Sequence, residues 1–331
     1  MMWHRKRRNI FIFIAKAVLI ALLVVMLIRG FFVESFSVTS LQMQASLLKG
    51  DKVFVNKTSY GIRMPVTLLS IPFTFDRFMG FKSYSSAIKF PYQRVFNNVV
   101  ERNDVVLYNN PGELGKPLDK RNLLLNRCIG LPGDTISAVG NRYIINHKEY
   151  TSSPDMMQLY RFNTAYVDTI GILARELDIH LYNAGRFDEH SLMLFLSKFD
   201  AYLINRNVSD SFDVLTEALN DLFYDFVVPH KGMTIELTHD NLTKYGQAIL
   251  AEMENRAGII EGKLMIDYKE QTSYTFADDY YWMICDNTIN SVDSRTIGFV
   301  PRKSIIGQAS FVWFSKGERG IRWDRSFSKV K

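Results

Sequence analysis

The stretch Thr39-Ser40-Leu41-Gln42-Met43-Gln44-Ala45-Ser46-Leu47-Leu48-Lys49-Gly50-Asp51 is the most informative part of this chain of 331 residues. Before it, residues 33–38 alternate bulky and polar side chains, which is typical of a strand with one buried face. After it, residues 52–57 are a second strand candidate. The stretch is therefore expected to be a loop that connects two strands.

A second informative block is Leu125-Asn126-Arg127-Cys128-Ile129-Gly130-Leu131-Pro132-Gly133-Asp134, in which an apolar strand candidate runs into a Pro-Gly-Asp turn. Further short strands are expected at residues 104–108, 123–129, 143–146, 235–237, 262–268 and 273–284. The chain is therefore expected to be mainly β.

The pattern changes to helical spacing between residues 152 and 262. One helix face is predicted from Phe212, Leu215, Leu219, Leu222 and Phe223. A second helix, capped by Thr238, would carry Leu242, Tyr245, Ile249 and Met253. We interpret residues 152–262 as an inserted α/β region that separates two halves of one β domain, residues 33–151 and 263–331.

Charge and hydropathy at the N-terminus predict a membrane anchor. Lys plus Arg exceeds Asp plus Glu by 40 − 34 = 6, and residues 5–8 hold four of the basic side chains. Residues 10–28 are apolar except Lys16, which is close to the roughly 20 residues that cross a bilayer. We predict a cytoplasmic tail (1–9), a transmembrane helix (10–29) and an outward-facing main domain. The near-balanced body argues against nucleic acid as a partner.

A cleaved secretory signal is the alternative for this segment. Such signals usually have 7 to 15 apolar residues before a small-x-small site. The present segment is longer, and Gly30-Phe31-Phe32-Val33-Glu34 contains no such site. An uncleaved anchor is therefore favoured.

Residues 64–96 are rich in aromatic side chains without a clear period. They include Phe73, Phe75, Phe78, Phe81, Tyr84, Phe90, Tyr92 and Phe96. Such residues next to an anchor are typical of the headgroup level of a membrane. A long loop packed on the core explains them equally well, so both interpretations stay open.

Four blocks resemble, in the same order, those of the bacterial type I signal peptidases, which are serine–lysine proteases. They are residues 50–63, Arg102-Asn103-Asp104-Val105-Val106, residues 126–134, and residues 286–301, which contain Ser291-Val292-Asp293-Ser294-Arg295 and end Gly298-Phe299-Val300-Pro301. The resemblance implies a membrane-tethered domain of coiled antiparallel β-sheets, whose cleft lies near the outer membrane surface.

The departures from that family's pattern lie where its chemistry takes place. Gln42 stands for the nucleophilic serine and Asn126 for the general-base lysine. Three further departures are Ala45 for proline, Cys285 for glycine and Thr288 for arginine.

Residues that the resemblance assigns to shaping the site are kept. Ser40 matches the oxyanion-hole serine. The supporting residues are Arg127, Ser291, Asp293 and Arg295. The peptide-binding cleft would be lined by Val38, Met43, Leu47, Leu124 and Leu125. A purely structural role in the core is the alternative for these five.

The two substitutions remove both chemical functions of a serine–lysine dyad, which needs a hydroxyl to attack and a neutral amine to accept its proton. Carboxamides do neither at neutral pH. A rebuilt dyad would have to use Ser40 or Ser46 with Lys49 or Lys52.

The chain has two cysteines, Cys128 and Cys285. On a strand, Cys128 shares a face with Asn126. One hypothesis is that a thiol fills the space that a long lysine would have taken. A disulfide and two unrelated buried thiols are the alternatives. The six histidines lack metal-ligand spacing, so we expect no metal and no cofactor.

We predict a catalytically inactive homologue of signal peptidase I in a bacterial cytoplasmic membrane, with a single span and its main domain in the periplasm. Its expected partners are the lipid bilayer, signal peptides of exported proteins, and an active paralogue or the secretion machinery. An active signal peptidase that uses other residues is the alternative. A third is a structural membrane subunit with a closed cleft.

Overall fold

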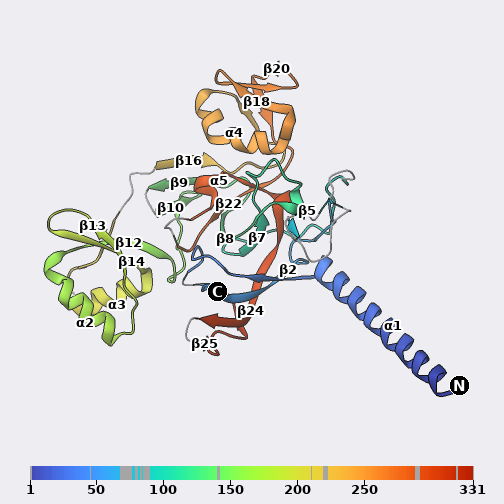
Figure 1. The fold of residues 1–331 in the computed structure, drawn as a ribbon. Coiled ribbons are helices and arrows are strands. Elements are labelled where there is room, and N and C mark those ends of the chain that lie inside the picture. The colour runs from blue at the N-terminus through green and yellow to red at the C-terminus, as the bar shows by residue number, and fades with distance from the viewer. Residues whose placement is uncertain are drawn as a thin grey trace.

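The protein is described by a computed structural model that covers residues 2–44, 46–67, 77–78, 81–82, 84, 90–139, 142–209, 211–218, 223–287, 291–317 and 320–330. Most of it is antiparallel β-sheet, with one long N-terminal helix that points away from the body (Figure 1). The expectation of a mainly β fold is confirmed.

A curled antiparallel sheet forms the centre of the molecule. Its path is β1 (Val33–Ser37), β2 (Asp51–Asn56), β24 (Ile305–Gly317), β7 (Val105–Asn109), β8 (Leu123–Gly130), β22 (Tyr280–Ile284) and β23 (Val300–Pro301). Two short strands, β25 (Gly320–Ile321) and β26 (Ser328–Lys329), also pair with β24. The long β24 shows register shifts against both β2 and β7, and such irregularities bend and twist a strand.

The loop between β1 and β2 is held against β24. Ser37 pairs with Lys52, and residues 38–50 form the connection between the two strands. Gly50 has φ 95°, and a Cβ there would lie 2.0 Å from the carbonyl oxygen of Lys316. Only glycine permits this close approach without strain. The prediction of two strands joined by a loop is confirmed.

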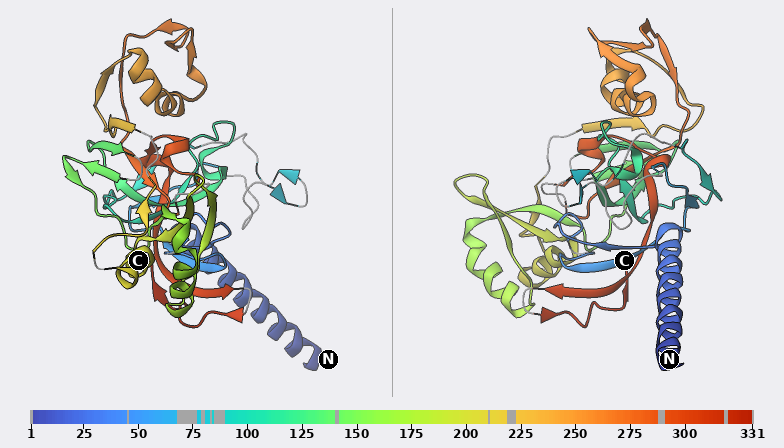
Figure 2. Two further views of the ribbon diagram at one scale, coloured as in Figure 1. Left: turned by 90° about the vertical axis from the view of Figure 1, so that its left-hand side faces the viewer. Right: turned by 45° about the vertical axis from the view of Figure 1, so that its right-hand side comes forward.

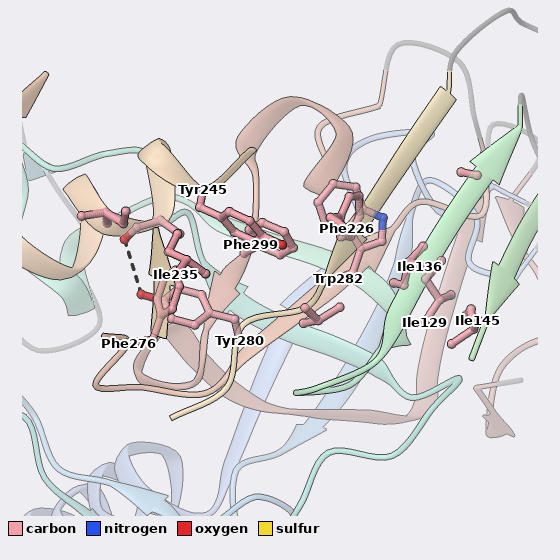
Figure 3. Close-up of a cluster of buried hydrophobic side chains, with 14 of the residues drawn as sticks. Ile129, Ile136, Ile145, Phe226, Ile235, Tyr245, Phe276, Tyr280, Trp282 and Phe299 are labelled. Atoms are coloured by element: carbon pink, nitrogen blue, oxygen red, sulfur yellow. Dashed lines mark hydrogen bonds between the residues drawn. The ribbon is translucent and has the colours of Figure 1, made fainter. Parts of the chain in front are cut away.

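A second layer packs on one side of the central sheet and encloses the largest core cluster (Figure 3). Its strands are β9 (Thr135–Val139), β10 (Arg142–Ile145), β11 (Lys148–Glu149) and β16 (Phe223–Val227) in one sheet, and β17 (Thr234–Glu236) with β21 (Ser273–Thr275) in another. Helix α4 (His239–Met253) contributes Tyr245, which stacks on Phe299 at 5.5 Å between ring centroids. Aromatic packing of this kind fixes the helix on the sheet.

The predicted start of α4 is confirmed in detail. Thr238 adopts an extended backbone, and its hydroxyl accepts a hydrogen bond of 3.2 Å from the backbone N–H of Asn241. After α4, the strands β18 (Ala257–Ile260), β19 (Lys263–Ile266) and β20 (Lys269–Glu270) form a small sheet at the upper end of Figure 1.

A separate lobe with its own core cluster lies between β11 and β16. It contains β12 (Met157–Asn163), α2 (Val167–Glu176), β13 (Tyr182–Arg186), β14 (Ser191–Ser197), α3 (Lys198–Val208) and β15 (Thr216–Glu217). We call it the β12–β15 lobe. It forms the green left-hand part of Figure 1.

The predicted helix through Phe212, Leu215 and Phe223 is wrong. Residues 216–217 form β15 and Phe223 begins β16, while Leu219 and Leu222 lie outside the described residues. The side chain of Asn205 accepts from the N–H of Leu215 at 2.7 Å and donates to its carbonyl at 3.0 Å. These two bonds hold the backbone of Leu215 in a non-helical bend directly before β15. The predicted strand 273–284 is likewise two strands, β21 and β22.

The short elements complete the chain. Two further two-stranded sheets are β3 (Ile62–Arg63) with β6 (Arg94–Val95), and β4 (Arg77–Phe78) with β5 (Phe81–Lys82). The short helices are η1 (Leu118–Lys120), η2 (Thr164–Tyr166), η3 (Glu254–Arg256), α5 (Ser294–Ile297) and η4 (Arg302–Ser304). In the aromatic segment, Phe96 is 72% exposed, and Phe73 and Phe75 lie outside the described residues.

Helix α1 (Met2–Phe31) contains a segment, Phe11–Phe31, that is long and apolar enough to cross a membrane and is not buried in the protein. Both views of Figure 2 show it extending away from the body. Only Phe32 separates α1 from β1. The ammonium of Lys57 donates to the carbonyls of Arg29 and Gly30, at 2.9 and 3.4 Å, and pairs with Glu34 at 2.7 Å. A cation at this end is favourable because a helix C-terminus carries partial negative charge.

Candidate active site

Three segments that are distant in the sequence meet at residues 285–287, directly after β22. The amide of Asn126 donates to the sulfur of Cys285 at 2.6 Å. The guanidinium of Arg127 contacts Asp286, and the backbone carbonyl of Gln42 accepts from the N–H of Asn287 at 2.9 Å. Gln42 and Asn126 therefore contact opposite ends of one short segment.

The side chain of Asn126 is fully buried and bonded at both ends. Its oxygen accepts from the phenol of Tyr108 at 2.7 Å. Its nitrogen donates to Cys285 and, at 3.4 Å, to the carbonyl of Val292. Burial raises the pKa of Tyr108 well above its ordinary value, so the phenol stays a donor. Nothing in this group of side chains offers an amine that could take up a proton.

The loop between β1 and β2 presents Ser40 to solvent and keeps Gln42 partly buried. The amide of Asn287 donates to the carbonyl of Leu41 at 3.1 Å, which adds a second bond to the same loop. Gln44 donates to the hydroxyl of Tyr182 in the β12–β15 lobe. Ala45 and Thr288 lie outside the described residues. The loop is thus tied both to residues 285–287 and to the lobe.

Arg127 and Asp286 form a buried ion pair at the centre of this arrangement. The two bonds measure 2.7 Å each, and the side chains are 5% and 1% exposed. Ser46 donates to Asp286 and accepts from Arg127 at 3.0 Å. Burial opposes the charged guanidinium, but its hydrogen bonds to Asp286 outweigh this and raise the pKa of Arg127. The ion pair fixes the loop through Ser46.

The remaining predicted support residues form a bracing frame behind Cys285. Asp293 is fully buried and accepts from the backbone N–H of Cys285 at 3.0 Å. Arg295 pairs with Asp293 at 2.6 Å and donates to the hydroxyl of Ser291 at 2.5 Å. The structure thus brings Ser291, Asp293 and Arg295 together. The frame holds the backbone of the segment that meets Asn126.

Four of the five predicted cleft residues belong to one hydrophobic cluster. Val38, Met43, Leu47 and Leu125 are each at most 5% exposed and lie in the cluster between β1, β2, β24 and β7. Leu124 is partly buried against a different cluster. These residues contact the protein's own interior in this conformation.

Two strand edges next to these residues carry no partner strand in the part of the chain that the structure describes. Strand β22 pairs with β8 only over residues 127–130, so residues 123–126 of β8 are paired on one side alone. Strand β1 ends the sheet. Unpaired edges are templates for an added strand.

The serine and lysine positions of a rebuilt dyad are not brought together. Ser40 is exposed, and Ser46 is bonded to Asp286 and Arg127 rather than to an amine. The amine of Lys52 lies over the rings of Trp313 and Phe314, at 5.5 Å from each centroid. Lys49 is exposed.

Both cysteines are buried free thiols, and Cys128 lies opposite Met283 in the pairing of β8 with β22. The disulfide alternative is therefore not what the structure contains. The thiol of Cys285 contacts the amide of Asn126, and the hypothesis that a thiol fills the space of a longer side chain stays a prediction.

We expect neither thiol to be alkylated in the folded protein at pH 8. Burial raises the pKa of Cys128 and of Cys285 far above that pH, so the reactive thiolate is scarce. Iodoacetamide followed by intact-mass measurement should show no adduct in the native protein and two in urea. Rapid native labelling of either residue would contradict the burial described above.

Sequence reasoning missed two contacts of the site. Tyr108 reaches Asn126 because Val106 pairs with Asn126, which places Tyr108 two residues further along the neighbouring strand. Tyr182 reaches Gln44 from the β12–β15 lobe, 138 residues away in sequence. The first depends on strand register and the second on the docking of a lobe, and neither leaves a local sequence signal.

Comparison with known proteins agrees with this fold, in which a helix that is apolar enough to cross a membrane precedes a mainly β domain. Residues 11–214 and 227–314 match the family described as Signal peptidase, peptidase S26. The chain therefore belongs to the signal peptidase family. That family implies membrane anchoring and signal peptides as substrates.

Similar relatives are called signal peptidase I. The protein of Buchnera aphidicola subsp. Baizongia pistaciae is 25% identical over 319 residues, covering 92% of this chain and 79% of the relative. The protein of Helicobacter pylori (strain ATCC 700392 / 26695) is 22% identical over 325 residues, covering 93% and 89% respectively. The similarity extends over nearly the whole chain.

Proposed function

We propose that this chain is a catalytically inactive member of the signal peptidase family that binds leader peptides at the membrane without cleaving them. The observation that supports this most directly is the state of Asn126. Its side chain is buried, neutral and bonded to Tyr108 and Cys285 at the position where the resemblance places the general base.

The chemical argument concerns proton transfer. Acylation requires a hydroxyl oxygen that attacks the carbonyl and a group that accepts its proton. An amide nitrogen is not basic, and Gln42 supplies no hydroxyl. An oxyanion hole at Ser40 would have no tetrahedral intermediate to stabilise. Family membership and the bracing frame are compatible with loss of turnover, because the frame holds backbone rather than reacting atoms.

Peptide binding rests on the unpaired edges of β1 and β8. A leader peptide in extended conformation would pair with these edges through its backbone, and such pairing does not require either dyad residue. The membrane helix would hold the edges near the lipid surface. A bacterial cytoplasmic membrane, with the tail of α1 in the cytoplasm, is the location we assign, and an active paralogue or the secretion machinery is the proposed recipient of the bound peptide.

The proposal predicts binding without hydrolysis, and binding that depends on the peptide backbone. The full chain in detergent micelles should cross-link to a leader peptide that carries a photoreactive residue, and the peptide should be recovered intact. The same peptide with alternate backbone nitrogens methylated keeps its side chains but loses donors, so its binding should fall at least tenfold. Equal binding of both peptides would exclude strand addition.

A second function, an active signal peptidase, is favoured by one observation: the hydroxyl of Ser46 donates to the carboxylate of Asp286. Cleavage by the purified chain that disappears in Ser46→Ala would establish it and overturn our proposal. If neither cleavage nor cross-linking is found, the chain is a structural membrane subunit.

A further inference from the structure

A cavity of about 460 Å³ lies where the end of α1 meets the β domain. One wall comes from the last turns of α1, with Met26, Leu27 and Phe31. The opposite wall is Leu107, Leu123 and Ile306 from the central sheet. Met26 and Leu27 are also 42% and 49% exposed, so the cavity continues into the apolar surface of the helix. A ligand here would touch protein on one side and hydrocarbon on the other.

Arg63 of β3 lines this cavity and has only neutral partners. Its guanidinium donates to the side chain of Asn109 at 2.7 Å, with longer contacts to the carbonyls of Lys303 and Ser304. In the described part of the chain no carboxylate lies within ion-pair distance of it. Burial lowers the pKa of Arg63 to about 10, so it remains a cation at neutral pH while poorly solvated. Such a cation is stabilised by an anion.

The other charged groups at the cavity already have partners. Lys57 pairs with Glu34 at 2.7 Å. Asp119 accepts from the backbone N–H of Thr67 at 3.0 Å and from its hydroxyl at 2.7 Å. Asp119 therefore also has only neutral hydrogen-bond partners, and the carboxylates of Asp119 and Glu34 raise the pKa of Arg63 from beyond ion-pair distance. Among the described residues, Arg63 is the cation at this cavity that has no ion-pair partner, whereas Lys57 has one.

We propose that this cavity binds a glycerophospholipid, with its phosphate on Arg63 and an acyl chain along Met26 and Leu27 of α1. The cavity is within the 300–1,000 Å³ range of small-molecule sites, and guanidinium groups bind phosphate with charge-assisted hydrogen bonds. The apolar helix face selects a lipid over a free phosphate ion. This site is independent of whether the chain cleaves or only binds peptides.

The test is native mass spectrometry of the full chain in detergent micelles with two lipids that share their tails. Dioleoyl-phosphatidylglycerol carries the phosphate, and dioleoylglycerol does not. We expect adducts with the first lipid and few with the second. Arg63→Gln should bind the phospholipid roughly ten- to hundredfold more weakly, the effect of losing one charge-assisted bond. Arg63→Lys should keep most of the affinity.

The control variants distinguish loss of the lipid site from loss of the fold. Arg256→Gln removes the same charge at an exposed pair with Asp267, far from α1, and should bind as the unaltered chain does. Leu27→Trp fills the cavity from the helix side, keeps Arg63, and should also lose the lipid. Unchanged binding in Arg63→Gln or in Leu27→Trp, equal binding of dioleoylglycerol, or displacement of the lipid by millimolar inorganic phosphate would each overturn the proposal.

Discussion

Cleavage of a preprotein is expected to rise by about 10³-fold or more when Gln42→Ser, Asn126→Lys and Cys285→Gly are combined in one chain. Removing the nucleophile or the base of a serine protease lowers kcat by about 10⁶-fold, which is about 8 kcal/mol of barrier. The triple variant supplies both groups that the resemblance assigns to a serine–lysine dyad, and we expect only part of that factor because the rest of the site is left as it is. A fluorogenic leader peptide, followed with the full chain in detergent, measures the gain.

The third substitution follows from the geometry of the site. The sulfur of Cys285 lies 2.6 Å from the terminal nitrogen of Asn126, and a lysine amine at that position would extend two bonds further. The double variant that keeps Cys285 should therefore stay inactive because lysine and thiol compete for the same space. A triple variant with Gln42→Ala in place of Gln42→Ser is the matched control and should not cleave. Turnover by that control, or by the unaltered chain, would show that other residues catalyse the reaction.

Arg127→Met is expected to destabilise the folded domain by about 3–5 kcal/mol. The substitution leaves the carboxylate of Asp286 buried without its cation, and an uncompensated buried charge is costly. It also removes a bond to Ser46, so the loop between β1 and β2 should loosen. Urea unfolding of the full chain in detergent, followed by tryptophan fluorescence, gives the free energy of unfolding.

Two controls distinguish charge burial from the loss of any ion pair. Arg256→Met breaks a pair whose side chains are 62% and 59% exposed, and should cost less than about 1 kcal/mol. Arg127→Met combined with Asp286→Leu removes both buried charges and should recover much of the loss. If Arg127→Met costs no more than Arg256→Met, the buried pair is not a stabilising element of this fold.

Local signals in the sequence predicted the elements that depend on local chemistry. The apolar run before Arg29, the alternating strand before Ser40 and the Thr238 cap all appear where they were expected. The predicted helix through Leu215 was wrong because a tertiary contact overrides the helical spacing of apolar residues. The side chain of Asn205 bonds both the N–H and the carbonyl of Leu215. The predicted helix face is also not a buried face, because Leu215 is 2% exposed whereas Phe212 and Phe223 are 54% and 68% exposed.

The sequence indicated residues of the candidate site but not the contacts between them. The motif positions of Asn126, Arg127 and Asp293 are visible in the sequence, and the resemblance places them near one another. Two contacts depend on strand register: the bond from Asn126 to Cys285, and the bond from the phenol of Tyr108 to Asn126. Whether a substituted position is empty, solvated or filled is a matter of packing, which sequence spacing does not encode.

Phe32 is the one residue between the end of α1 and the start of β1, so the helix and the central sheet are joined without a linker. Lys57, directly after β2, bonds the carbonyls of Arg29 and Gly30 at the end of α1 and so adds a second link between the helix and the sheet. Hydrophobic helices respond to bilayers of different thickness by changing their tilt. We therefore expect a change in the tilt of α1 to move β1 with it, so that bilayer thickness would change the distance between Gln42 and the lipid headgroups.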